Sequence, residues 1–144
     1  MGTFEVVRTV HADRDRVFAV VADFRAHGDY IPLTTIHAGQ EAIGPGWRFT
    51  GRTGVGPVAL IDRMEVTRWE PGRGFRVEKR GPVLDGWGEL HLSADGPDTR
   101  LVWRERIVVR PAAVGLVLGP ILDPANKALL GAAVDRMVAR AERA

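Results

Sequence analysis

A glutamate stands among apolar side chains in the segment LVWRERIVV, residues 101–109. The segment is rich in Val, Ile, Leu and Trp, which is typical of a β-strand, and successive side chains of a strand point to opposite faces. One face therefore carries Trp103 and Glu105, and the other carries Arg104 and Arg106. A carboxyl group on an apolar face is suited to acid/base chemistry or to contact with the polar group of a ligand. The alternative is a structural role, in which Glu105 bonds to an arginine or to buried water.

A second acidic residue has the same kind of position. Asp62 lies between Leu60 and Met64 at alternating positions of another expected strand. An unpaired buried charge costs several kcal/mol, so both acids need a partner or contact with water in a cavity. Lys79 lies one diagonal position from Asp62 on the neighbouring strand, so the two form either a structural ion pair at a cavity rim or part of a catalytic group. The candidate catalytic residues are Glu105 and Asp62.

Two expected hairpins determine which way these side chains face. The turn ADGPDT pairs Ala94 with Thr99, which places Gly88 opposite Glu105. Gly88 and its neighbour Gly86 either make room for a ligand or let the sheet bend sharply around a helix. In the other hairpin, the turn EPGR pairs Trp69 with Gly74 and so places Met64 opposite Lys79. The side chains expected on the concave side are Asp62, Lys79, Trp103 and Glu105.

The opposite face of these strands is expected to lie in solvent. It carries Trp87, Glu89, His91, Arg104 and Arg106. Glu89 faces Arg104, which suggests cross-strand charge pairing, and Trp87 is interpreted as an outer platform for an arginine.

Other apolar-face side chains are expected to form the core or the wall of a cavity, two roles that merge when the cavity is apolar. The candidate ligand-binding residues are Tyr30, Phe49, Met64, Lys79, Gly88, Trp103, Asn126 and Leu129. Tyr30 either reaches the cavity mouth or caps the core. The four histidines have no metal-ligand spacing and the chain has no cysteine, so we expect neither a metal nor a cofactor.

The elements before residue 111 are predicted from their start and stop signals. A strand is expected over 4–10, followed by a helix with Asp13 as its N-cap. A second short helix fits 24–30 and ends before Pro32, because a proline disfavours helical geometry at the preceding residue. Turn signals then recur roughly every ten to fifteen residues over 35–110, which predicts successive hairpins.

A long helix is expected at the C-terminal end of the sequence. Asp123 has the character of an N-cap and Pro124 suits the first helical position. One face of this helix carries Leu122, Asn126, Leu129, Ala133 and Met137. A sheet with one apolar face needs a cover, so we expect the apolar members of this face to pack against the concave side of the sheet.

Composition limits the class of protein. The 144 residues contain 45% hydrophobic residues, which suits one domain over 1–144 with a sizeable core. With 20 basic and 18 acidic residues the net charge is only +2, which argues against a nucleic-acid partner. The start lacks the apolar run of a signal peptide, and the longest apolar tract, 112–122, is too short to cross a bilayer. We therefore expect a cytoplasmic protein without stable membrane insertion.

The order of elements, together with the segment RTVHADRDRVFAVVADFRAHGDYIP, resembles the START-like (SRPBCC) superfamily and specifically its bacterial polyketide cyclase/dehydrase branch. The resembling features include the pair Val17 and Phe18 in the first helix and the aromatic Tyr30 shortly before Pro32. The resemblance covers nearly the whole chain. It implies an α+β helix-grip fold, in which a curved antiparallel sheet of six or seven strands wraps the C-terminal helix and leaves a cavity for a hydrophobic ligand.

Two classes of function are compatible with this sequence. In the first, the protein resembles aromatase/cyclases, and cavity carboxylates move protons as a polyketide-like ligand cyclises or loses water. In the second, it is a non-catalytic carrier or sensor of a lipid, quinone or other small molecule, with segments 53–57 and 112–122 as mobile elements at the cavity mouth. Both require a hydrophobic small-molecule ligand, whose identity the sequence does not specify.

Overall fold

The computed structural model describes residues 2–143, without the side chains of Leu118 and Leu122. In chain order the elements are β1 (Thr3–Val10), α1 (Arg14–Val21), the 3-10 helix η1 (Phe24–Asp29), β2 (Thr34–Ala38), β3 (Arg48–Val55), β4 (Val58–Glu70), β5 (Gly74–Arg80), β6 (Leu84–Asp95), β7 (Asp98–Val109) and α2 (Ala112–Glu142). Asp13 caps α1 as expected, because its carboxylate accepts a hydrogen bond from the backbone N–H of Arg16 at 2.9 Å.

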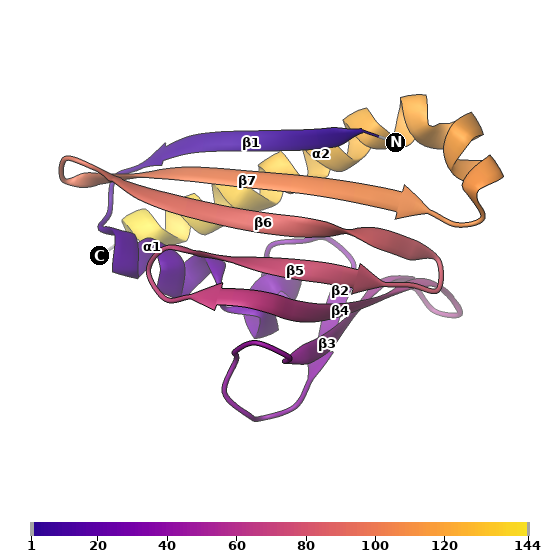
Figure 1. Ribbon diagram of the computed structural model, residues 1–144, viewed down its shortest axis with the longest axis horizontal. Helices are drawn as coiled ribbons and strands as arrows, with labels where there is room; N and C mark the ends of the chain where they lie inside the picture. The colour runs from indigo at the N-terminus through magenta and orange to yellow at the C-terminus, as the bar shows by residue number, and fades with distance from the viewer. Residues whose placement is uncertain (1, 144) are drawn as a thin grey trace.

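The seven strands form one antiparallel sheet in the order β1-β7-β6-β5-β4-β3-β2. α2 lies across the sheet behind β1, β7 and β6, and α1 and η1 lie on the same side of it (Figure 1). This is the expected α+β helix-grip fold. The concave face of the sheet is covered by helices from both ends of the sequence, and most of the candidate site residues lie between these two layers.

The hairpin of β6 and β7 has the predicted register. Ala94 pairs with Thr99, and Gly88 pairs with Glu105. The predicted outward residues His91, Arg104 and Arg106 are exposed, and Glu89 is partly buried on the same face. The charge pairs on this face differ from the expected one, because Glu89 pairs with Arg76 of β5 and Arg104 pairs with Glu5 of β1. The expected packing of an arginine on the ring of Trp87 is confirmed, since the guanidinium of Arg76 lies 4.7 Å from the centre of that ring.

The hairpin of β4 and β5 corrects one prediction at its turn. Glu70, and not Trp69, pairs with Gly74. One extra residue between Val66 and Arg68 shifts the register back, so Met64 still pairs with Lys79 as expected. The irregularity is a β-bulge, which places two residues of one strand opposite one of the other. The side chains of Asp62 and Lys79 therefore point to the predicted face of the sheet, although the turn was predicted one residue out of place.

The start of the terminal helix was predicted wrongly. α2 begins at Ala112 and contains both Pro120 and Pro124, so Pro124 is an interior residue. The carboxylate of Asp123 accepts a hydrogen bond from the backbone N–H of Gly2 at 3.2 Å instead of capping a helix. A proline inside a helix removes one backbone hydrogen bond and bends the axis. The first turns of α2 accordingly run in a different direction from the rest (Figure 1).

The buried face of α2 lies in its second half. Ala133 and Met137 are buried as expected, together with Val134. Leu129 is 45% exposed, which contradicts its expected burial, and the side chain of Leu122 lies outside the described residues. The helix therefore seals the sheet near its C-terminal end and lies more openly over it near Leu129.

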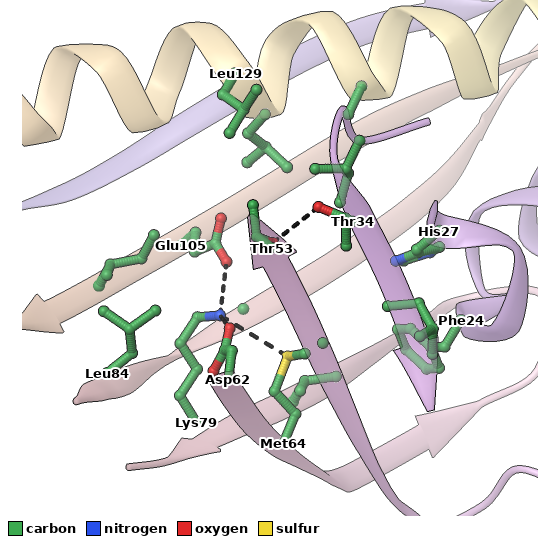
Figure 2. Close-up of a pocket in the computed structure, with 18 of the residues that line it drawn as sticks. Phe24, His27, Thr34, Thr53, Asp62, Met64, Lys79, Leu84, Glu105 and Leu129 are labelled. Carbon is green, nitrogen blue, oxygen red and sulfur yellow. Dashed lines mark hydrogen bonds and ion pairs between the residues drawn. The ribbon is translucent and has the colours of Figure 1, made fainter. Parts of the chain in front are cut away.

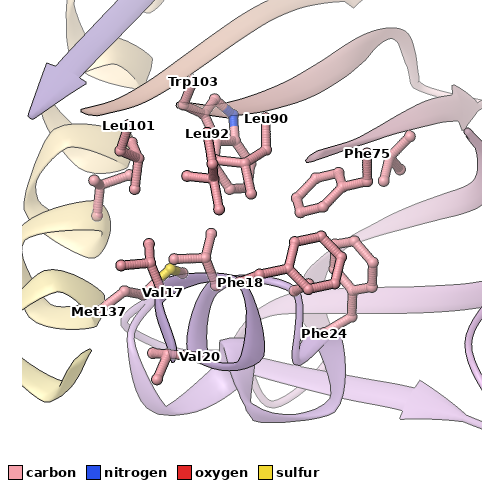
Figure 3. Packing of buried hydrophobic residues seen from close by; sticks show 14 of the residues in the cluster. Val17, Phe18, Val20, Phe24, Phe75, Leu90, Leu92, Leu101, Trp103 and Met137 are labelled. Carbon is pink, nitrogen blue, oxygen red and sulfur yellow. The ribbon is translucent and has the colours of Figure 1, made fainter. Parts of the chain in front are cut away.

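An aromatic and aliphatic core fills the space between α1, η1 and the strands. The ring of Phe24 lies 4.8 Å from that of Phe75 and 4.9 Å from that of Phe49, centre to centre. Side chains from the helices and from the strands interdigitate around it (Figure 3). Phe24, Trp103 and Met137 belong to this core and also border the cavity described below.

Candidate functional site

A cavity of about 240 Å³ lies between the concave face of the sheet and α2. Its wall is mainly apolar, with contributions from η1, every strand from β2 to β7, and α2. Nine of the residues singled out in the sequence border it: Phe49, Asp62, Met64, Lys79, Gly88, Trp103, Glu105, Asn126 and Leu129. Leu129 approaches it from α2, opposite the strands (Figure 2).

Tyr30 lies outside this wall. It is partly buried and packs against the hydrophobic core. Its backbone carbonyl accepts a hydrogen bond from Nη1 of Arg136 at 2.8 Å, which ties the end of η1 to α2. Of the two positions expected for Tyr30, the structure shows the one at the core.

Three charged side chains meet on one wall of the cavity, and we call Asp62, Lys79 and Glu105 the charged cluster (Figure 2). Nζ of Lys79 donates a hydrogen bond to Oδ2 of Asp62 at 2.5 Å and lies 3.9 Å from Oε1 of Glu105. The side chains of Lys79, Asp62 and Glu105 are only 8%, 16% and 13% exposed. The lysine thus has a carboxylate on each side in a nearly dry environment.

Two glycines of β6 lie between the strands that carry Lys79 and Glu105. β6 lies between β5 and β7, where Gly86 pairs with Lys79 and Gly88 pairs with Glu105. Lys79 reaches toward the carboxylate of Glu105 across this intervening strand, on the side where Gly88 carries no side chain.

Each glycine fits one of the two interpretations left open by the sequence. Gly86 has a φ of +119°, and a Cβ there would lie 1.9 Å from the carbonyl oxygen of Arg106, so the backbone itself requires glycine. Gly88 borders the cavity, and a Cβ there would meet only ordinary contacts.

Burial and the neighbouring charges set the protonation of the charged cluster. Burial raises the pKa of Glu105; the ammonium of Lys79 opposes this rise and the carboxylate of Asp62 adds to it. Burial by itself would lower the pKa of Lys79, but the charges of Glu105 and Asp62 and the hydrogen bond to Asp62 outweigh it, so that pKa is raised. Lys79 therefore stays an ammonium, and Glu105 holds a proton more readily than an ordinary carboxyl.

Two polar atoms near the charged cluster have no hydrogen-bond partner among the described residues. They are Oδ1 of Asp62 and Nε1 of Trp103, and both are buried. Buried polar atoms are normally paired, so each is a place where a ligand or a water molecule can complete the bonding.

His27 also borders the cavity, and the sequence analysis did not single it out as a site residue. It is buried, and its Nε2 lies 2.8 Å from the carbonyl oxygen of Val21. Burial lowers its pKa, although the bond to Val21 and the charge of Asp23 act in the opposite direction. The ring is therefore neutral and Nε2 donates to Val21. The sequence signal that could have identified it as a wall residue is its position three residues after Phe24 on a helical segment.

Most of the other wall residues missed from the sequence are uncharged. They include Ile31, Thr34, Ile36, Thr53, Leu60, Leu84 and Ile107. The hydroxyls of Thr34 and Thr53 lie 2.8 Å apart and satisfy each other. These positions carry the ordinary alternation of a strand, which does not distinguish a cavity wall from a packed core.

Among the residues described, no group of three or more His, Asp or Glu side chains is placed to hold a metal ion. No described helix combines the length and the apolar character needed to span a bilayer.

Solved structures similar to this one share its fold over nearly the whole chain. A Thermus thermophilus protein has a TM-score of 0.80 at 13% identity and covers 97% of both chains. The Zhui aromatase/cyclase of a Streptomyces species has a TM-score of 0.78 at 23% identity and covers 99% of this chain and 94% of that one. At these identities the likeness shows the fold alone.

The di-domain ARO/CYC StfQ from the steffimycin biosynthetic pathway has a TM-score of 0.69 at 16% identity, and the match spans 96% of this chain and 51% of StfQ. No curated protein matches the sequence. Residues 1–142 match the family described as polyketide cyclase / dehydrase and lipid transport. Because this match extends over almost the entire sequence, the chain belongs to that family.

Proposed function

We propose that this chain binds a hydrophobic small molecule, polyketide-like or lipid-like, in its cavity, and that Glu105 transfers a proton to or from the ligand. The observation that carries the proposal is the charged cluster on one wall of a mainly apolar cavity. The apolar wall supplies affinity for a hydrophobic body, and the cluster supplies the only charged groups among the described wall residues.

The chemistry of a cyclase or dehydrase needs a group that moves protons. Aldol cyclisation and loss of water both remove a proton from carbon and deliver one to oxygen. The raised pKa of Glu105 suits a carboxyl group that alternates between its two protonation states. The unpaired N–H of Trp103 supports the same role, because it can donate a hydrogen bond to an oxygen on which negative charge develops.

The binding part is tested with N-phenyl-1-naphthylamine, a neutral dye that fluoresces in apolar surroundings. We expect a saturable rise in emission with the unmodified protein and a much smaller one with Leu129→Trp, which fills the cavity from a half-exposed position on α2. Ile61→Trp is the matched control, because Ile61 is 37% exposed and does not border the cavity. A missing rise, or equal rises in the two variants, contradicts binding in this cavity.

The proton-transfer part is tested with 5-nitrobenzisoxazole, a neutral bicyclic molecule. A base removes its ring proton, the N–O bond breaks, and a coloured phenolate forms. We expect acceleration above the buffer rate that increases as pH rises through the raised pKa of Glu105, because only the carboxylate is a base. Glu105→Gln should abolish the acceleration, whereas Glu41→Gln, at an exposed position outside the cavity, should retain it. Equal rates in the two variants would remove the catalytic role of Glu105.

A carrier is the second candidate, and a different observation favours it. The first turns of α2 expose Leu116, Val117 and Ile121, which are 81%, 74% and 69% exposed. Exposed apolar side chains suit delivery of a ligand to another apolar surface. A carrier binds the naphthylamine dye in the cavity but shows no acceleration that depends on Glu105, so the same two experiments separate the candidates.

A further inference from the structure

We infer that the cavity is specific for an uncharged ligand whose carbonyl oxygen lies over Gly88, between the indole N–H of Trp103 and the carboxyl group of Glu105. Ligands with an anionic head group are excluded. The inference rests on the proposed function, since it concerns the same cavity. It adds the chemical group that the ligand presents and the place where that group binds.

The space over Gly88 brings the two polar groups together. A methyl group built on Gly88 would lie 3.6 Å from Oε1 of Glu105 and 3.7 Å from Nε1 of Trp103. The space is empty of protein because glycine has no side chain, and it opens into the cavity. A ligand atom that packs against the Cα of Gly88 from this side therefore lies beside both groups.

The indole of Trp103 determines that this atom is an acceptor. Nε1 is buried and has no partner among the described residues, and an indole N–H can only donate. A donor shut away from water without an acceptor is unfavourable, so the group that fills the space over Gly88 must accept a hydrogen bond. A carbonyl oxygen has two lone pairs, and a protonated Glu105 can donate to the second of them.

The charges around the cavity act against an anion. Lys79 is the only basic residue among the charged wall residues, and its ammonium is engaged by Asp62 at 2.5 Å and by Glu105 at 3.9 Å. His27, from η1, is neutral, and Asn126 of α2 carries no charge. The charged cluster therefore carries a net charge of about −1 with both acids ionised and about zero with Glu105 protonated. A carboxylate of a ligand beside the cluster would meet repulsion and, among the described wall residues, no free cation.

A cationic ligand fits less well than a carbonyl. An ammonium group over Gly88 would bond to an ionised Glu105, but it has no lone pair for the N–H of Trp103. The cavity volume of about 240 Å³ is below the roughly 300–1,000 Å³ of sites for drug-sized ligands, which favours a compact body of two or three rings.

Four naphthalenes of similar size test the inference by calorimetric titration at pH 7.5. They are 2-acetylnaphthalene, 2-ethylnaphthalene, 2-naphthoate and 1-(2-naphthyl)ethylamine, which differ in the group attached to the ring. We expect the ketone to bind roughly threefold to tenfold more tightly than the hydrocarbon, which is the effect of one net hydrogen bond. Naphthoate should bind more weakly than the hydrocarbon, and the amine no more tightly than it.

The outcomes separate this inference from the function on which it rests. Naphthoate or the amine binding as tightly as the ketone, or the hydrocarbon equalling it, overturns the inference while binding of apolar molecules stands. If none of the four binds, the proposed function fails and the inference fails with it.

Gly88→Ala places a methyl group beneath the proposed position of the carbonyl and displaces the carbonyl oxygen from the two polar groups. Gly51→Ala is the matched control, because Gly51 also borders the cavity and a Cβ there would meet Cε of Met64 at 3.5 Å, an ordinary contact. We expect Gly88→Ala to abolish the preference for the ketone over the hydrocarbon and Gly51→Ala to retain it. A preference that survives Gly88→Ala places the carbonyl elsewhere and overturns the inference.

Trp103→Phe removes the donor itself. Trp47→Phe is its control, since Nε1 of Trp47 is also buried and unpartnered among the described residues but does not border the cavity. The readout is the ratio of ketone to hydrocarbon affinity within each variant, so a general loss of stability cancels. We expect a ratio near one for Trp103→Phe and an unchanged ratio for Trp47→Phe. Equal ratios in the two variants overturn the inference.

Glu105→Gln tests the exclusion of anions. The amide keeps the size of the side chain and removes its negative charge, so naphthoate should bind more tightly to the variant than to the unmodified protein. An unchanged or weaker affinity for naphthoate overturns the electrostatic part of the inference.

Discussion

The two ends of the concave face are built from the same strands and yet have opposite character. At the closed end, side chains of α1 and η1 pack into β5, β6 and β7, and Phe24 is surrounded by other rings (Figure 3). At the open end, the same strands face the cavity and carry the charged cluster (Figure 2). The strand alternation is identical at both ends, so the difference comes from what covers the face.

The closed end mainly stabilises the fold, whereas the open end carries the cavity on which the proposed function depends. The closed end buries apolar surface without a charge, which is the main favourable contribution to folding. The open end leaves a cavity and keeps three charges nearly dry, and both features are unfavourable to folding. We therefore expect the closed end to tolerate truncation poorly, and the open end to tolerate changes of volume but not the loss of its cation.

The largest effect is expected for truncation at the closed end. Phe75→Ala removes a fully buried ring that does not border the cavity and should lower the free energy of unfolding by about 3–5 kcal/mol, measured by urea denaturation. Leu60→Ala at the cavity wall should lower it by about 1 kcal/mol or less, because Leu60 is 39% exposed and borders space that is already empty. Similar losses in the two variants would break the contrast between the ends.

A nearly equal loss is expected when the charged cluster loses its cation. Lys79→Met leaves two buried carboxylates without a counter-charge and should cost about 3 kcal/mol at pH 8. The loss should shrink as pH falls and Glu105, whose pKa is raised, takes up a proton. Because the pKa of Lys79 is raised, the stability that its charge contributes is fully present below its ordinary pKa and disappears as pH rises through the raised one. Lys127→Met, on the exposed side of α2, should change stability little at any pH.

The two glycines of β6 should respond differently to the same substitution. Gly86→Ala forces a Cβ to 1.9 Å from a carbonyl oxygen at a φ of +119° and should cost about 1–3 kcal/mol. Gly88→Ala meets ordinary contacts and should be neutral, or stabilising by about 0.5 kcal/mol through the unfolded chain. Thermal unfolding of the two variants measures the difference, and equal losses would show that Gly88 also has a backbone role.

The smallest effect is a pH dependence at Glu105. Its pKa is raised in the folded protein, so the stability associated with its protonated form is fully present below the ordinary carboxyl pKa and is lost as pH rises through the raised value. Glu105→Gln does not titrate and should be more stable than the unmodified protein at pH 8, with the difference closing toward pH 4. A variant that is less stable at pH 8 would mean that the contact with Lys79 outweighs burial.

Much of the fold and the inward acids could be predicted because strand periodicity and turn chemistry are local signals. The turn ADGPDT sets the register that brings Glu105 opposite Gly88. The error at Trp69 arose because a bulge between Val66 and Arg68 has no residue signature in the sequence. Asp123 and Pro124 carry the local signals of a helix start, which could not reveal that the chain is already helical from Ala112.

The geometry of the site was less accessible, because it depends on contacts between distant strands. The approach of Lys79 to Glu105 depends on the order of the strands in space, which places β6 between them, and on the lack of a side chain at Gly88. The positions of Leu129 and Tyr30 depend on how α2 bends and on where it lies on the sheet. Helical periodicity in the sequence predicts neither of these. His27 is drawn into the wall by tertiary packing, with only its spacing from Phe24 as a hint.

The paired glycines of β6 have a consequence for how this site changes in evolution. A side chain at Gly88 would intrude between Trp103 and Glu105, and a side chain at Gly86 would collide with the backbone of β7. If Lys79 is replaced by an apolar residue, Glu105 is left as a buried charge without a cation, which is unfavourable. The space at Gly88 is then no longer needed for the contact between Lys79 and Glu105. Among relatives of this chain we expect positions 62, 79, 88 and 105 to covary as one unit, so that this contact between next-nearest strands is gained or lost as a whole.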